Sequence, residues 1–160
     1  MIFENANIND ISALVELRIA YLLEDYGNLT ENKLTIIVNN LYGYFQEHLN
    51  KDLLVFICRD KNKIVSCCFL CVTEKPSNPT FINGKTGTIL NVYTKPEYRK
   101  KGIAGNLLKM LLAESEKIGL DFVELKATDS GYNLYKSIGF EDVMSKYHNM
   151  KYIIDINNGF

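Results

Sequence analysis

Basic residues and glycines gather in the middle of the chain, between an apolar segment and an amphipathic one. The cations are Arg99, Lys100 and Lys101, and the glycines are Gly102 and Gly105. Hydrophobic residues recur at three- and four-residue steps after the first glycine, which predicts a helix that begins there. The first amides of a helix lack partners within it and carry a partial positive charge, and glycine lets a ligand approach them. This arrangement predicts an anion site, and phosphate is the anion that best suits it.

Two sequence blocks narrow this prediction. Arg99-x-x-Gly102-x-Ala104 resembles the arginine/glutamine-x-x-glycine-x-glycine/alanine signature of the GNAT superfamily of acyl-CoA-dependent N-acetyltransferases, whose loop cradles the pyrophosphate of coenzyme A. The segment from Leu134-Tyr135 to Gly139-Phe140 resembles the leucine-tyrosine-x-x-x-glycine-phenylalanine block of the same superfamily. The blocks come in the family's order, and the resemblance is firm from about residue 88 to residue 140.

The resemblance implies that acetyl-CoA is the co-substrate. Amides of residues 100–105 would meet its pyrophosphate, and backbone groups of residues 92–94 would pair with its pantetheine arm as an added strand does. Superfamily members often have a bulge in this strand, which frees a donor for the thioester oxygen. The alternative to a phosphate site is an ordinary helix start whose lysines are solvated and bind no ligand. The candidate cofactor residues are Val92, Tyr93, Thr94, Arg99, Lys100, Lys101, Gly102, Ile103, Ala104 and Gly105.

Tyr135 is the candidate catalytic residue that the second block implies. A hydroxyl at the sulfur can protonate the thiolate that leaves when an amine attacks the thioester. A packed helix tyrosine is the alternative. Many relatives carry asparagine and alanine where this chain has Thr128 and Gly131, and some place a carboxylate, as general base, where it has Thr88. A water relay or a neutral amine would make such a base unnecessary.

The acceptor pocket would be bordered by the first two helices and the last strands, according to the same resemblance. The polar residues at the end of the first helix are Arg18, Tyr21, Glu24, Asp25 and Tyr26. Acids there would suit a cationic amine or a basic peptide, and an exposed helix face explains them equally well.

The periodicity of apolar residues predicts the elements that would hold these groups. Helices are expected over residues 7–26 and 30–48, from the glycines to about 118, and near 131–137. Strands are expected over 53–59 and 64–73, up to Pro96, over 122–127, and near 141–144 and 148–154. This order fits an α/β fold with a mixed sheet covered by helices on both faces. The resemblance implies a mostly antiparallel, GNAT-like sheet in which the strands carrying Val92 and Phe122 run parallel and splay apart into a cofactor cleft.

Size and composition limit the alternatives. The 160 residues suit a single domain over 1–160, and a net charge of −1 gives no field that favours nucleic acid or an acidic membrane. We expect no membrane span and no secretion signal, hence a cytoplasmic protein. Cys58, Cys67, Cys68 and Cys71 lack the second pair of a zinc ribbon and lie in apolar strands, so we expect core positions and no metal.

Three functional hypotheses remain open. In the first, the protein is an acyltransferase that moves an acetyl group from acetyl-CoA to a primary amine of a small molecule, peptide or protein, by direct attack in a ternary complex. In the second, it is a catalytically silent acyl-CoA-binding regulatory or interaction domain. A nucleotide-binding protein is a weaker third. The sequence leaves the acceptor and the oligomeric state open, a homodimer included.

Overall fold

The computed structural model describes residues 1–154. The chain forms two compact units, Met1–Lys126 and Ala127–Phe160, and each has its own internal contacts. The first unit holds the sheet and the helices that cover it, whereas the described part of the second unit holds one helix and the segment that follows it.

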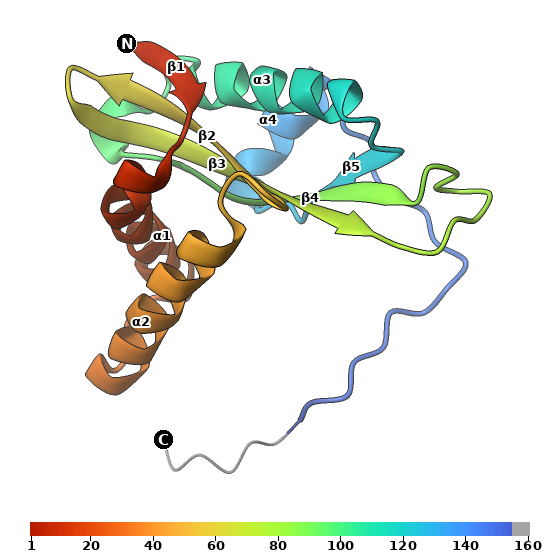
Figure 1. Ribbon diagram of the computed structural model, residues 1–160, viewed down its shortest axis with the longest axis horizontal. Helices are drawn as coiled ribbons and strands as arrows, with labels where there is room; N and C mark the ends of the chain where they lie inside the picture. The colour runs from red at the N-terminus through yellow and green to blue at the C-terminus, as the bar shows by residue number, and fades with distance from the viewer. Residues whose placement is uncertain (155–160) are drawn as a thin grey trace. The chain divides into compact units, whose positions relative to one another are not determined.

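Five strands form one mixed sheet within the described part of the chain, in the order β1-β2-β3-β4-β5 (Figure 1). The first three pairs are antiparallel, and β4 and β5 are parallel. The strands are β1 (Ile2–Asn5), β2 (Leu53–Asp60), β3 (Lys63–Glu74), β4 (Lys85–Thr94) and β5 (Phe122–Glu124). The predicted α/β class and the mostly antiparallel sheet with one parallel pair are therefore confirmed. Strand β1 was not predicted, because four residues are too few for a clear alternation.

Helices cover both faces of this sheet, as expected. The elements α1 (Ile11–Tyr26) and α2 (Glu31–His48) lie on one face and α3 (Ile103–Lys117) on the other (Figure 1). A short 3-10 turn, η1 (Ile8–Asp10), precedes α1, and another, η2 (Pro96–Tyr98), follows β4. The predicted caps are present: Asn7 and Asp10 form a capping box, and the Thr30 hydroxyl accepts from the Lys33 amide.

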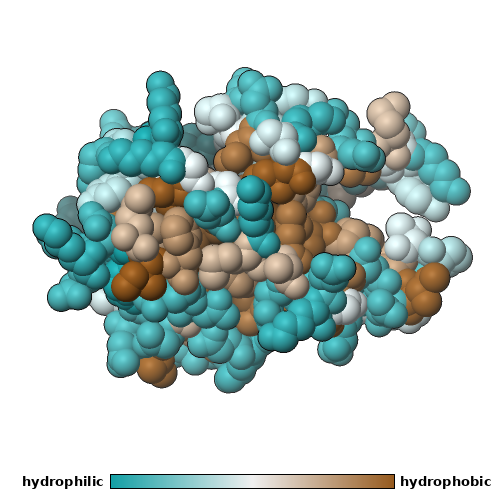
Figure 2. All heavy atoms as spheres, turned by 90° about the horizontal axis from the view of Figure 1, so that it is seen from above, coloured by the Kyte–Doolittle hydropathy of each residue, from teal (hydrophilic) through white to brown (hydrophobic). Residues whose placement is uncertain are grey.

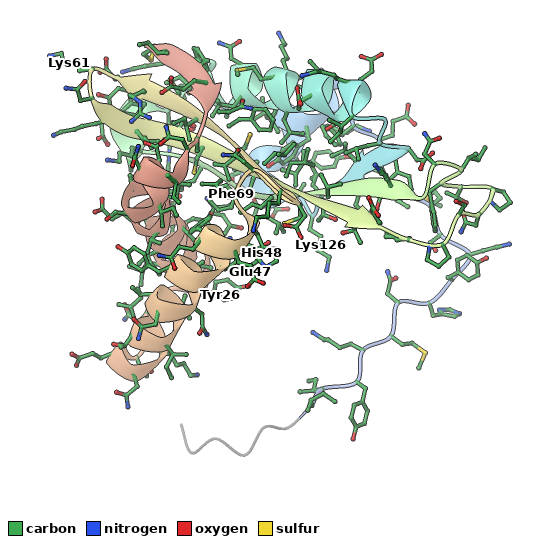
Figure 3. All side chains as sticks on the ribbon, viewed as in Figure 1. Tyr26, Glu47, His48, Lys61, Phe69 and Lys126 are labelled. Carbon is green, nitrogen blue, oxygen red and sulfur yellow. The ribbon has the colours of Figure 1, made fainter. Side chains whose placement is uncertain are left out.

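Apolar side chains are buried on both faces. On the α1 and α2 side, Phe45 meets Phe69 edge to face at 5.5 Å between ring centroids, and Figure 3 labels Phe69 on the sheet. On the other side α3 buries an apolar stripe that includes Leu107 and Leu111. Hydrophilic side chains predominate on the face shown in Figure 2, with hydrophobic ones exposed in smaller groups. No helix among the described residues is long and apolar enough to cross a membrane.

The cysteines take the core positions that their apolar strands predicted. Cys58, Cys67 and Cys68 are buried, Cys71 is half-buried, and all have free thiols. Burial raises the pKa of Cys67 to about 12, so that this thiol stays protonated at neutral pH. The described residues contain no cluster of three or more histidines, cysteines or carboxylates that could hold a metal ion.

The second unit departs from the prediction. Its helix α4 (Asp129–Ile138) agrees with the expected helix near 131–137, but the strands predicted near 141–144 and 148–154 are wrong, since neither stretch has regular secondary structure. Apolar side chains such as Met144 and Met150 are more than 90% exposed there. A strand forms only where a neighbour accepts its ladder hydrogen bonds, and this segment bonds locally instead, for example between the Ser145 hydroxyl and the Tyr147 amide at 3.0 Å.

Candidate active site

The loop before α3 has the backbone shape of an anion-binding concavity. Lys100 and Gly102 have positive φ angles of 59° and 73°, and the residue between them does not. Residues whose φ alternates in sign can turn successive amides toward one side, as in an anion-binding nest. Glycine adopts a left-handed φ with the least strain, which suits Gly102 at the N-cap of α3.

The amides of this loop have no protein acceptor. Residues 100–105 donate no backbone hydrogen bond within the described part of the chain, and the first bond of α3 runs from Asn106 N to Gly102 O, at 3.1 Å. No side chain caps the helix start. A Cβ placed on Gly102 would meet nothing within 4 Å, and Lys100, Lys101 and Gly102 are exposed. The helix therefore opens to solvent with free donors, which is the condition that the phosphate prediction requires.

Side chains fix the loop from both ends. Arg99 donates to Glu24 of α1 at 2.6 Å and to the Thr94 carbonyl at 2.9 Å. Lys101 donates to the Glu97 carbonyl at 2.9 Å, and the Tyr98 hydroxyl donates to Asp60 at 2.8 Å. These bonds tie the loop to α1, to its own 3-10 turn and to the end of β2.

The pKa shifts of these groups follow from the same contacts. The hydrogen bond to Glu24 raises the pKa of Arg99, and the hydrogen bond to Asp60 raises that of Tyr98. Burial raises the pKa of Tyr93, and the negative charge of Glu24 adds to the shift. Arg99 thus keeps its charge and both phenols keep their protons at neutral pH.

Strand β4 loses its neighbour just before the loop. It pairs with β5 only over residues 86–88, opposite 122–124. Past Thr88, residues 89–94 have no strand partner on that edge in the structure as described. This is the fork that the resemblance implied, and it leaves this edge of β4 without a strand partner, as strand pairing by a ligand requires, although the Thr94 carbonyl already accepts from Arg99.

The bulge that the sequence could not show lies in this strand. Cys67 pairs with Tyr93 and Phe69 with Leu90, so that two residues of β4, Asn91 and Val92, face a single residue of β3.

Asn91 fixes that bulge through both ends of its amide. It has a φ of 52°, a left-handed value that asparagine tolerates. Its buried side chain donates to the Cys67 sulfur at 3.4 Å and accepts from Arg18 Nη1 at 3.2 Å. Sequence reasoning missed Asn91, and the only signal was an asparagine inside an apolar strand.

Thr88, the position where some relatives have a carboxylate, lies at the mouth of the fork. It is paired with Cys71 on one side and with Glu124 of β5 on the other. Cys71 packs against the core on the α1 side. Residues in register on neighbouring strands share a face, so Thr88 and Glu124 also project toward α1 and α2. Although residue 88 is not a carboxylate here, the neighbouring strand β5 therefore places the carboxylate of Glu124 beside it on the same face.

Tyr135 lies on α4, and the structure explains the block around it. Gly139, with φ of 113°, ends the helix, and the Phe140 amide donates to the Tyr135 carbonyl at 3.0 Å. The rings of Tyr135 and Phe140 meet edge to face at 5.9 Å between centroids. A Cβ on Gly131 would come within 2.9 Å of the Tyr135 ring, so this glycine lets the ring lie against its own helix. The role of Tyr135 as an acid stays a prediction.

One histidine, His48, has its partner outside the loop before α3. His48 ends α2, where Figure 3 labels it, and its Nδ1 lies 2.8 Å from the carboxylate of Asp52.

Residues 51–142 match the sequence profile of the family described as "Acetyltransferase (GNAT) domain". The chain belongs to this GNAT family. The matched residues include the loop before α3, the bulge and the fork of β4, and both sequence blocks. No curated protein matches the chain by sequence.

Solved structures agree with this family. A predicted acetyltransferase from Clostridium acetobutylicum, solved with acetyl-CoA, has 28% identity and a TM-score of 0.82 over 94% of this chain and 95% of its own. A GCN5-related N-acetyltransferase from Ralstonia eutropha has 22% identity and a TM-score of 0.78, over 93% of this chain and 97% of its own. A ribosomal-protein-alanine N-acetyltransferase from Brucella melitensis has 17% identity and a TM-score of 0.68, over 94% and 100%. The last two show a shared fold.

Gly102 offers a direct test of the anion site. Gly102→Asp should weaken CoA binding by at least tenfold, because a carboxylate would stand where phosphate is expected. Gly102→Asn is the matched control, since asparagine has the same size and tolerates a positive φ but is uncharged. Titration calorimetry at two salt concentrations, with melting curves to check folding, measures both. Equal affinities of the two variants would contradict the site.

Proposed function

We propose that the protein transfers the acetyl group of acetyl-CoA to the nitrogen of a primary amine, by direct attack in a ternary complex. The observation that carries this proposal is the row of amides over residues 100–105, which have no backbone acceptor among the described residues, begin in the exposed stretch 100–102, and follow the edge of β4 that lacks a strand partner past Thr88. We also propose that residues 1–160 act as one catalytic domain in the cytoplasm, which the free thiols support.

The residues present fit acetyl-CoA. The amides of residues 100–105 are suited to a diphosphate, and the open edge of β4 at residues 92–94 is suited to the amides of a pantetheine arm. Lys100 is exposed and adds a cation to the site. When bound, acetyl-CoA would supply an activated acetyl thioester. We assign its carbonyl oxygen to the bulge at Asn91 and Val92, because a bulge interrupts the ladder and frees backbone donors.

Two protons must move in this reaction. A carbon–nitrogen bond forms and a carbon–sulfur bond breaks, so that the amine gives up a proton and the departing thiolate gains one. We assign Tyr135 as the donor to the thiolate. We assign Glu124 as the acceptor of the amine proton, since it projects from the mouth of the fork toward the α1 face, whereas Glu24 is paired with Arg99.

A catalytically silent acyl-CoA-binding domain is the second candidate. Thr88 stands where some relatives have a carboxylate, and this observation favours it. Release of free CoA thiol from acetyl-CoA, measured across a panel of amines, separates the two. We expect release with at least one class of amine. Tight CoA binding with no release beyond the slow background would favour the silent domain.

Tyr135→Phe should lower kcat by about 10² or more while KM for acetyl-CoA stays within about twofold, because only the proton on the leaving thiolate is lost. Tyr132→Phe is the matched control on the same helix, since the Tyr132 hydroxyl donates to Asp142 at 2.8 Å and is exposed. Steady-state kinetics of thiol release measures both. An unchanged kcat in Tyr135→Phe would remove this residue from the mechanism.

Glu124→Gln should lower kcat/KM for the amine by about 10² and flatten the fall of the rate toward acid pH, because glutamine cannot take up a proton. Glu116→Gln, an exposed carboxylate of α3, should have no effect. The measurement is the pH profile of kcat/KM. A profile that keeps both its height and its shape in Glu124→Gln would exclude Glu124 as the base.

A further inference from the structure

One arginine differs from the other two in its partners. The chain has three arginines. Arg59 bridges Glu4 and Asp10 at 2.7 and 2.9 Å, and Arg99 pairs with Glu24 at 2.6 Å. Arg18 pairs with no carboxylate of residues 1–154; its only hydrogen bond goes to the Asn91 amide oxygen. Arg18 is therefore the arginine whose positive charge is not neutralised by an ion pair with a described carboxylate.

The surroundings of Arg18 hold it in place without neutralising it. It is half-buried on α1, its Nη1 lies 3.2 Å from Asn91 Oδ1, and its guanidinium stands 5.4 Å from the centre of the Tyr21 ring. A guanidinium has five N–H donors. The others find no acceptor in the part of the chain that the structure describes. No buried side-chain donor of the described residues lacks a partner, so these remaining donors of Arg18 are accessible from solvent and can meet an anion.

The acids that sequence analysis noted at this helix end already have partners. Glu24 is held by Arg99, and Asp25 accepts from the Tyr21 hydroxyl at 3.5 Å. The sequence left them as candidates for binding a cationic amine. Glu24 is thus neutralised by Arg99, whereas Asp25 keeps its negative charge at the exposed end of α1. The charge that bonds to the bulge itself is the positive one of Arg18.

We propose that Arg18 binds a carboxylate of the acceptor, so that the acceptor is a small amine that also carries a carboxylate, such as an amino acid. This rests on the proposed function, because Arg18 bonds to Asn91 at the bulge to which the thioester carbonyl is assigned. Arginine is suited to the role, since its planar fork matches the two oxygens of a carboxylate. The hydrogen bond to Asn91 occupies Nη1 of Arg18 and thereby orients the guanidinium plane.

A purely structural role for Arg18 makes a different prediction. If Arg18 served only to support Asn91, its loss would disturb the bulge and slow the reaction with every amine alike. If it binds the acceptor, its loss should change the preference between acceptors. The ratio of kcat/KM for an amine with a carboxylate to that for the same amine without one distinguishes the two roles.

The experiment compares L-amino acids with their carboxamides at equal concentrations of the neutral amine, because carboxamides are less basic. For the wild type we expect kcat/KM to favour the carboxylate by about 10- to 100-fold, mainly through KM, as charged hydrogen bonds permit. Arg18→Gln should bring the ratio near one, whatever loss of rate both substrates share through the weakened support of Asn91. Arg18→Lys should keep part of the preference for the carboxylate substrate, because lysine retains the positive charge. Lys33→Gln, which removes an exposed charge on α2, should leave the ratio intact.

A wild type without preference for the carboxylate, or an Arg18→Gln variant that slows both substrates equally, would overturn the proposal. A separate binding measurement tests the role of Arg18 independently of the proposed function. N-acetyl amino acids and their carboxamides are titrated onto the protein with CoA present and followed by calorimetry. If no amine at all releases thiol, the proposed function fails. Weaker binding of the N-acetyl amino acid to Arg18→Gln would then still support the role of Arg18, and equal binding would overturn it.

Discussion

Free backbone donors at an exposed helix start are the constraint on which the rest of this structure depends. They are satisfied by water in the absence of a ligand, so they cost the fold little, yet they offer an anion several aligned N–H groups that need no rearrangement. Their alignment needs a rigid loop. Arg99 supplies it by joining Glu24 and the Thr94 carbonyl, and Tyr98 adds a bond to Asp60. The side chains of Arg99 and Tyr98 are thereby occupied, which leaves the main chain and the exposed Lys100 to meet an anion.

Strand β4 gives up regular pairing twice within a few residues. It loses β5 after Thr88, and its register against β3 shifts at Asn91. Each departure forfeits ladder hydrogen bonds, which a strand tolerates only where another group can replace them. Under the proposed function the fork receives an extended ligand and the bulge donates to a carbonyl, so that both losses serve the same reaction. The buried Asn91 amide, bonded to Arg18 and Cys67, keeps the bulge in one conformation.

How far the sequence could predict this site depends on the range of each interaction. The helix start was predictable because glycines, cations and apolar periodicity lie within a few residues of one another. The contact between Arg18 and Asn91 joins residues 73 positions apart, and no local pattern reports it. The bulge depends on which residues of β3 face β4. The predicted strands after residue 140 failed for a related reason: alternation shows that a segment could pair, but pairing needs a partner strand.

The charged residues at the end of α1 also show that long-range contacts decide which groups are available to an acceptor. A sequence shows two acids and an arginine at the end of the first helix and favours no single acceptor. The structure shows that one of those acids holds the loop before α3 through Arg99 and that the other accepts from Tyr21. Helix α1 thus serves two purposes: Glu24 stabilises the loop assigned to the donor, and Arg18 presents a positive charge at the bulge where the acetyl group is assigned. Which charge an acceptor would meet depends on which side chain contacts the bulge, and a count of charged residues does not show this.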